Sequence, residues 1–497
     1  MVGCDTWKPG LWSTLAALVG CGPAPAETLP RQALMEPETC TECHAGHVRE
    51  WRSSMHAYAV DDPVFVAMNA RGQEETDGEL GDFCVGCHAP LAVREGFTDD
   101  GMNLDELPEE LRGVTCYFCH TAASISEQHD NPLGLPANNP LLPGDPVTML
   151  GGLHGAKRPS AHDVAYSPLH DGDRVESGAF CGGCHDIVTD RGVHLERTFQ
   201  EWERSFIGSP ELRNPPPEDI ESERQTCIEC HMDARDGLAA ETDEFPTEAR
   251  TRGVHSHMTP GIDTALTDWP DVDIQVKAIE CLMRAGVKLR IYPHPVTPEV
   301  ELEAEVGHHF PTGASLDRRF WVEVTAWNAE GEVVLEEGKL QSPSDPEPDT
   351  FMLRDHALGA GGQEVHMFWE AAPSADNEKG FTANTVPAQG PDVFDHTLRI
   401  SEYRTRAEPA RIEARLMMRP VGHDVLDDLL RSGHLSANQV GDMKARMRTL
   451  SPASTRVVWE ANAEDKWKEV EKPRGRPLDC DAHWLCDLYP ERTECAP

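Results

Sequence analysis

The sequence predicts an α+β protein in which a mainly helical, loop-rich domain precedes a β-sandwich. Residues 40–231 carry five copies of a Cys-x-x-Cys-His motif among short helical stretches and long loops. After about residue 285, apolar and polar side chains alternate with the period of β-strands. Hydrophobic residues form only 39% of the 497-residue chain, which indicates that something other than aliphatic side chains fills part of the core.

The charge balance restricts the classes of partner. The chain has 86 acidic against 44 basic residues, a formal net charge of −42. Such a surface disfavours binding to nucleic acid or to anionic lipid headgroups and favours a basic partner. The alternative is a solvated acidic surface that has no specific partner.

Residues 1–20 are predicted to be an export signal. Its apolar stretch, 11–20, is too short to span a bilayer. The stretch Leu18-Val-Gly-Cys21 resembles a bacterial lipobox, so we expect lipidation of Cys21 and attachment to a membrane face. Ordinary cleavage after Ala26 is the alternative. Residues 21–38, rich in Pro, Ala and Glu, then form a linker.

Ten of the sixteen cysteines fall into the five motifs, and the histidine that ends each motif separates them from common cysteine-pair sites. Zinc sites need no histidine after each cysteine pair, and five pairs would leave one unmatched. A thioredoxin-like dithiol would lie in an α/β pattern, which is absent, and short disulfides would not account for the histidines.

Cys-x-x-Cys-His is the attachment motif of c-type haem, in which both thiols bond to the macrocycle and the histidine ligates the iron. We therefore expect five covalent c-type haems in a domain spanning 39–284, with helices near 44–59, 62–71 and 196–206. The predicted attachment cysteines are Cys40, Cys43, Cys84, Cys87, Cys116, Cys119, Cys181, Cys184, Cys227 and Cys230, and the predicted proximal ligands are His44, His88, His120, His185 and His231.

Further motifs suggest a family. These are WRSSMHA (51–57), GVTC (113–116), SGAFCGGCHDIV (177–188), TFQEWERS (198–205) and GHHFPTG (307–313). In this combination the segment from about 39 to 335 resembles a bacterial multihaem cytochrome c family, relatives of the tetrahaem electron acceptor of hydroxylamine oxidoreductase.

The resemblance implies sixth ligands for the irons. It points to five histidines outside the motifs: His56, His162, His170, His257 and His308. Each has the alternative of a packing or surface role, and which one serves which haem does not follow from the sequence. Other candidates are His255, His309, Met55, Met68 and Met258. His47 is expected to be exposed or to bond a haem propionate.

Residues 285–420 are predicted to form the β-sandwich, with an immunoglobulin-like layout but without the Cys…Trp…Cys pattern of true immunoglobulin domains. Asn328 to Gly331 is predicted to form a hairpin turn. The expected strands are 287–292, 300–306, 320–327, 332–337, 364–369, 396–400 and 410–418.

Residues 421–497 are predicted to form a helical segment and a cysteine-containing tail. Amphipathic patterns at 424–432 and 436–448 indicate two helices. Cys281, Cys480, Cys486 and Cys495 allow up to two disulfides, in one of three connectivities, in an oxidising compartment.

Together these patterns predict electron transfer through a row of five haems between redox proteins of the bacterial cell envelope, in a periplasmic protein or an outer-membrane-attached lipoprotein. Nucleic acid is not an expected partner, membrane contact is expected only through the lipid, and the oligomeric state stays open.

The alternative is an oxidoreductase acting on nitrite, hydroxylamine or tetrathionate. The absence of a Cys-x-x-Cys-Lys motif disfavours it, and no catalytic residue is assigned. A third possibility is a binding module centred on the sandwich.

Overall fold

The computed structural model covers the whole chain and describes residues 28–125, 148–154, 161–189, 191–232, 234–241, 251–283, 286–340, 350–373, 381–391, 393, 396–462 and 467–469. The export signal, Cys21 and the three tail cysteines lie outside the described residues. Cys281 is disulfide-bonded, whereas the ten motif cysteines form no disulfide. Within the described ranges, none of the helices is both long and apolar enough to span a bilayer.

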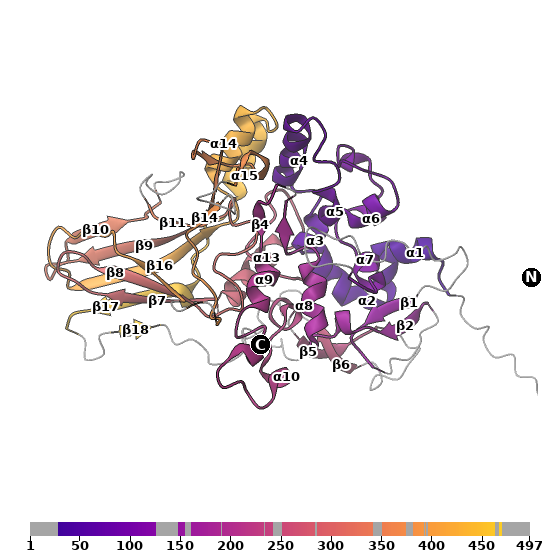
Figure 1. Cartoon of the computed structure of the whole chain (residues 1–497), viewed down its shortest axis with the longest axis horizontal. Helices are drawn as coiled ribbons and strands as arrows, with labels where there is room; N and C mark the ends of the chain where they lie inside the picture. Colours follow the sequence, from indigo (N-terminus) through magenta and orange to yellow (C-terminus); the bar gives the residue numbers. More distant parts are fainter. Residues whose placement is uncertain are drawn as a thin grey trace, which may run out of the picture.

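The α+β class is confirmed: a region of short helices and loops adjoins a region of larger sheets (Figure 1). Two-residue to five-residue strands in this first region form the small pairs β1–β2, β3–β4 and β5–β6. Its helices are α1 (Arg31–Met35), α2 (Pro37–Arg52), α3 (Met55–Tyr58), α4 (Pro63–Glu75), α5 (Val85–His88), α6 (Pro90–Arg94), α7 (Cys116–Thr121), α8 (Val175–Gly182), α9 (Thr198–Glu203), α10 (Ile220–Glu223), α11 (Cys227–His231) and α13 (Val272–Leu282). Its strands are β1 (Thr148–Gly151), β2 (Asp163–Tyr166), β3 (Ile187–Val188), β4 (His194–Glu196), β5 (Ala234–Leu238) and β6 (Thr251–His255).

Polar caps explain where several of these short helices begin. Thr115 and Thr226 each precede a motif cysteine, and their hydroxyls accept from the backbone N–H groups three residues later. Glu229 completes a capping box with Thr226, and Ser54 caps α3 in the same way. Such caps satisfy helix N–H groups that have no partner within the helix.

Two glycines allow α8 and α9 to approach closely. A Cβ at Gly178 would lie 2.6 Å from the Trp202 ring, and one at Gly182 would lie 2.5 Å from the Phe199 ring. Because the glycines are four residues apart, they lie on one face of α8. This contact fixes the helix that leads into the fourth motif.

Two antiparallel sheets dominate the second region. One has the order β10-β9-β16-β17-β18, with β11 also pairing with β9, and the other has the order β15-β8-β7. A three-stranded sheet, β13-β12-β14, lies apart from them. The strands are β7 (Val287–Tyr292), β8 (Glu299–Ala304), β9 (Arg319–Trp327), β10 (Val333–Glu337), β11 (Met352–Leu353), β12 (Asp355–Leu358), β13 (Glu364–Val365), β14 (Phe381–Ala383), β15 (Thr397–Ile400), β16 (Arg411–Arg419), β17 (Arg456–Glu460) and β18 (Trp467–Glu469).

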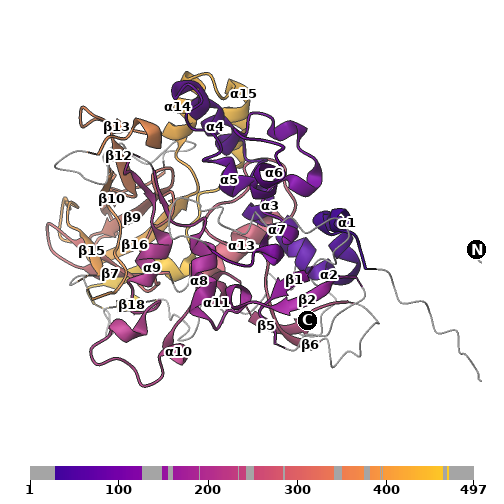
Figure 2. The ribbon, with the colours of Figure 1, turned by 45° about the vertical axis from the view of Figure 1, so that its right-hand side comes forward.

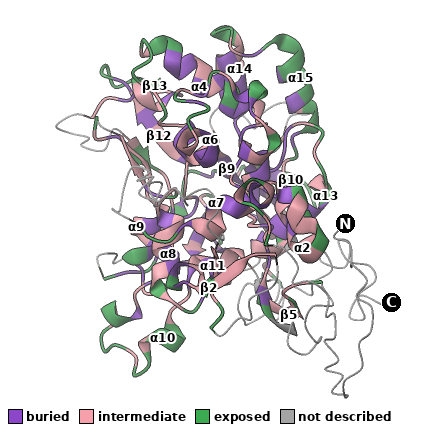
Figure 3. Cartoon of the chain, turned by 90° about the vertical axis from the view of Figure 1, so that its right-hand side faces the viewer, coloured by how far each residue is buried: buried purple, intermediate pink, exposed green. Residues whose placement is uncertain are grey.

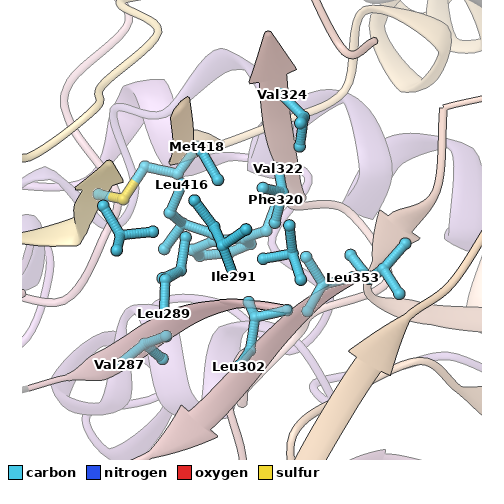
Figure 4. Close-up of a cluster of buried hydrophobic side chains, with 14 of the residues drawn as sticks. Val287, Leu289, Ile291, Leu302, Phe320, Val322, Val324, Leu353, Leu416 and Met418 are labelled. Atoms are coloured by element: carbon cyan, nitrogen blue, oxygen red, sulfur yellow. The ribbon is translucent and has the colours of Figure 1, made fainter. Parts of the chain in front are cut away.

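A continuous apolar core joins the two dominant sheets (Figure 4). Alternate residues of β7 (Val287, Leu289 and Ile291) are buried against side chains from β9 and β16, such as Val322 and Leu416. This alternation is what a strand with one buried face requires. The sheets therefore stack face to face, while the immunoglobulin-like connectivity stays a prediction.

The C-terminal helices pack back onto the motif-bearing region. α14 (His423–Arg431) and α15 (Ala437–Arg446) lie beside α4 in Figures 1 and 2. Val64 and Ala67 of α4 share a buried cluster with Val425, Leu429 and Val440. Figure 3 shows the opposite, exposed side of α15, so this helix is amphipathic as predicted.

An ion-pair network around the buried Arg71 side chain reinforces this junction. The Arg71 side chain is only 8% exposed and contacts Glu75 at 2.7 Å and Asp428 at 2.8 Å. His366 contacts Asp428 as well, at 3.2 Å. The network therefore connects α4, the segment after β13 and α14.

Most of the predicted strands are confirmed, and two differences have physical causes. The segment 364–369 is extended only at Glu364–Val365, after which His366 turns toward Asp428. The main sheet continues past residue 420, because β17 pairs with β16. The predicted turn at Asn328 is present, and Gly331 takes a φ of 83° there.

The junction yields a stability prediction. Arg71→Met should lower the free energy of unfolding by about 2 kcal/mol, because it removes the buried guanidinium that bonds both Glu75 and Asp428. The matched control is Arg448→Met, since Arg448 is 48% exposed and pairs with Asp273, whose side chain is 74% exposed. The control should cost less than about 1 kcal/mol. Denaturant unfolding followed by circular dichroism measures both, and equal losses would contradict the assigned role of Arg71.

Candidate haem-binding site

The five motifs converge on one cavity of about 2490 Å³ inside the first region, which extends to the sheet region. All five motif histidines and nine of the ten motif cysteines line it. Pockets for a single small ligand usually measure about 300–1,000 Å³. The cavity is therefore large enough for several macrocycles, and its lining supplies their attachment groups.

Each motif histidine has its Nδ1 held by a residue outside its own motif. The distances are between 2.6 and 3.1 Å. A hydrogen bond at Nδ1 fixes the tautomer and leaves Nε2 free to ligate a metal. The acceptors for His44, His88, His120 and His231 are the carbonyls of Ala239, Ala59, Leu150 and Pro260, and the acceptor for His185 is the Glu196 carboxylate.

Four motif histidines face a second imidazole across the cavity. Two imidazoles on opposite sides of one metal, each bonded at about 2 Å, would have ring centres about 6 Å apart. The ring-centre distances are 6.4 Å for His44–His162, 6.1 Å for His120–His257, 6.4 Å for His185–His56 and 6.3 Å for His231–His308. The donor set and its spacing thus fit bis-histidine haem iron.

The WRSSMHA segment positions His56. The Trp51 indole donates to the Val114 carbonyl, and the Val114 N–H donates to the His56 carbonyl. Gly113 allows this approach, because its φ is 71° and a Cβ there would lie 2.6 Å from that same carbonyl oxygen. Burial lowers the pKa of His56 to about 4, so its imidazole is neutral and able to ligate.

The GHHFPTG segment positions His308 with the help of α9. The Glu201 carboxylate accepts from the His309 N–H at 3.0 Å and from the Thr312 hydroxyl at 2.6 Å. Phe310 is buried and packs edge-on against Phe320 of β9. The loop is thus held from both sides, and burial lowers the pKa of His308 to about 4.

His257 and His162 reach the cavity from two other segments. The His257 backbone N–H donates to Glu50, a fully buried carboxylate of α2 that also pairs with Arg235. The Nδ1 atoms of both histidines lie near carbonyl oxygens, at 3.0 Å in each case.

His170 lies near the third motif in a different orientation. Its Nε2 is 2.8 Å from the Cys119 carbonyl, and its buried Nδ1 has no hydrogen-bond partner among the described atoms. Its ring centre is 5.6 Å from that of His120. His170 is therefore placed to use Nδ1, not Nε2, toward a metal.

The second motif differs from the other four. Phe65 stacks on the His88 ring with a centre-to-centre distance of 3.9 Å and supports that ring from its face. Among the described residues, no imidazole lies opposite His88 at the spacing of the four pairs.

The fourth motif has the one carboxylate acceptor. Burial opposes a charge on His185, but Glu196 at 3.0 Å outweighs it and raises the pKa of His185 to about 9. A carboxylate makes an imidazole a more basic ligand than a carbonyl does. The sequence contained no signal for this role, because Glu196 lies eleven residues past the histidine, on β4.

Residues 39–121 match the family model described as cytochrome c554 and c-prime. This match supports a multihaem c-type cytochrome. A penta-heme cytochrome c552 from Thermochromatium tepidum is similar in structure, with 18% identity, a TM-score of 0.48, and coverage of 88% of this chain and 100% of that chain. No curated protein matches the chain.

Contacts between cysteines give the neighbours of each motif in the cavity. The Cys40 thiol adjoins the Cys116 thiol, and the Cys87 thiol adjoins that of Cys184. Cys181 and Cys227 form a third such contact. The first motif therefore adjoins the third, and the fourth adjoins both the second and the fifth.

The remaining candidates have other surroundings. His309 pairs with Glu201, and the Met55 sulfur is 3.9 Å from the Gln275 amide nitrogen. His47, expected at the surface or on a propionate, lines the cavity, 4.8 Å from the His257 ring. Met258 is buried beside His257, while His255 and Met68 also line the cavity.

The Glu196 carboxylate, which accepts from His185, yields a redox prediction. Glu196→Gln should raise the midpoint potential of one haem by about 60 mV, the equivalent of a tenfold change for a one-electron couple. The reason is that a neutral amide no longer makes His185 a strong donor to oxidised iron. A spectroelectrochemical titration measures it. Glu203→Gln, an exposed carboxylate on α9, is the control, and a matching shift there would contradict the assigned role of Glu196.

Proposed function

We propose that this cytochrome carries five covalent c-type haems and transfers electrons along them. The supporting observation is the set of five motif histidines in one cavity, each with Nδ1 held and four with an opposed imidazole. Bound haem supplies one-electron redox chemistry. The chain's own groups bind, orient and enclose it.

In this proposal the ten motif cysteines attach the haems, and His44, His88, His120, His185 and His231 are the proximal ligands. The distal ligands are His162 for the first motif, His257 for the third, His56 for the fourth and His308 for the fifth. His170 is the remaining candidate, through Nδ1. Paired imidazoles close an iron to substrates, which suits electron transfer better than catalysis.

A second candidate function rests on the second motif. Because no described imidazole lies opposite His88, that haem would have an open face. This observation favours an oxidoreductase acting on a small nitrogen or sulfur compound such as nitrite, hydroxylamine or tetrathionate. No acid or base is assigned for such a reaction, so electron transfer is the function that we place first.

The cellular setting belongs to the same proposal. We infer export to the bacterial cell envelope, attachment through a lipid on Cys21, and exchange of electrons with other redox proteins there. The relationship to the tetrahaem electron acceptor of hydroxylamine oxidoreductase and an immunoglobulin-like connectivity of the sandwich are further parts of it. The c-type family match supports export, because such cytochromes are typically exported.

A haem count and a spin-state measurement test the function. A pyridine haemochrome assay should give five haems per chain, and electron paramagnetic resonance should show low-spin signals from the four paired sites. Fewer than five haems would contradict the proposal. A high-spin haem that binds nitrite or hydroxylamine would favour the second candidate instead.

The same experiment has a matched pair of variants. His308→Ala should convert one low-spin haem to high spin, because it removes the imidazole opposite His231. His309→Ala should leave the low-spin signals unchanged, because its ring pairs with Glu201. Identical spectra for the two variants would contradict the assignment of His308.

Lipidation is tested separately. Labelled palmitate should be incorporated by cells that produce the protein, and Cys21→Ala should abolish the label. A control substitution at Cys4, which lies in the predicted signal, should keep it. Labelling that persists in Cys21→Ala would contradict the proposed anchor.

A further inference from the structure

The loop between α6 and η1 (Leu104–Glu106) exposes large apolar side chains. Phe97 and Met102 are each 53% exposed, and Val66 on the adjacent helix α4 is 40% exposed. α4, α5 and α6 lie on the side of the molecule away from the large sheets (Figure 1). We call Phe97 and Met102, which the same loop carries, the apolar patch.

Hydrogen bonds from side chains fix the backbone of the loop that carries the patch. The Asn69 and Gln73 side-chain amides of α4 both donate to the Asp100 carbonyl, at 2.8 and 3.0 Å. The Asn103 amide donates to the Phe97 carbonyl and closes the loop. Bonds that hold the backbone in this way keep the apolar side chains at the surface, where burying them would require a partner.

The surroundings of the patch are strongly acidic. Residues 74–110 contain twelve carboxylates, no lysine and a single arginine, Arg94. Asp82, Asp99, Asp105 and Glu106 are exposed. An apolar centre within a charged rim is the usual composition of a protein–protein interface.

The loop also lies directly on a haem motif. Gly101 has a φ of 69°, and a Cβ there would lie 2.3 Å from Val85, the residue after the first cysteine of the second motif. The Asn69 amide nitrogen would be 2.8 Å away. A protein docked on the patch would therefore be close to the second haem site, as electron exchange requires.

We propose that the apolar patch and its acidic rim form the docking surface for a basic redox protein, one whose own cofactor edge is surrounded by lysines. The inference rests on the proposed electron-transfer function. Opposite charges steer such a partner to the patch, and apolar contact then holds it near the second motif. A second copy of this chain is disfavoured as the occupant, because it carries the same charge of −42.

Stopped-flow kinetics with a lysine-rich mitochondrial cytochrome c as the probe tests the apolar centre. Phe97→Ala/Met102→Ala should lower the second-order rate constant of electron transfer about fivefold, because truncating anchor side chains weakens docking. Val296→Ala/Val333→Ala is the control, since these valines are 53% and 41% exposed on the sheet region. Equal rate constants for the two double variants would overturn the proposal.

A second pair of variants tests the acidic rim. Asp99→Asn/Glu106→Gln should reduce the fall in rate constant between low and about 0.15 M ionic strength. Glu330→Gln/Glu408→Gln removes the same charge from exposed positions on the sheet region and should keep the wild-type salt dependence. Identical salt dependence in both variants would overturn the proposal.

A small-molecule control separates the docking proposal from the proposed electron-transfer function. Dithionite should reduce the haems of the wild type and of every variant at the same rate, since it needs no docking surface. If the wild type passes no electrons between its haems and any acceptor, the proposed function fails. If the wild type does so and the patch variants match their controls, only the docking proposal fails.

Discussion

The site depends on one constraint: an imidazole must present Nε2 to the cavity while its Nδ1 is held elsewhere. For His44 the acceptor is 195 residues away in sequence, and for His88, His120 and His231 it is about 30 residues away. These bonds bring distant loops to the motifs. They act together with a buried apolar cluster of the same region, which includes Leu91, Leu104 and Leu111.

The same constraint explains why the two regions form one molecule. His308 faces His231, yet its loop is anchored to the sheet region through Phe310 and to α9 through Glu201. On the other side, α14 packs on α4 and is tied to it by Arg71. The sheet region therefore helps to hold the His308 imidazole in the cavity.

Differences among the five motifs arise from their surroundings, because the motifs themselves are nearly identical in chemistry. His185 bonds a carboxylate where the others bond carbonyls, and His88 has a phenyl ring beside it and no described imidazole opposite. Such differences set the basicity of a ligand and the access to an iron. In the proposed function, motifs of the same type can in this way hold haems with distinct redox and binding properties.

The sequence by itself determined the class of the protein, the attachment motifs and most strands of the sheets, because these depend on local spacing and on the alternation of apolar residues. Through its resemblance to multihaem cytochromes, it also pointed to all four histidines that face a motif histidine, together with His170. It did not predict that β17 extends the main sheet, nor that α14 returns to α4, since both are contacts between distant segments. The pairing of the imidazoles, the acceptor of each Nδ1 and the role of Glu196 were decided only by the tertiary structure. The physical reason is that a histidine's chemistry is set by which atoms face its two nitrogens, and those atoms come from other parts of the chain.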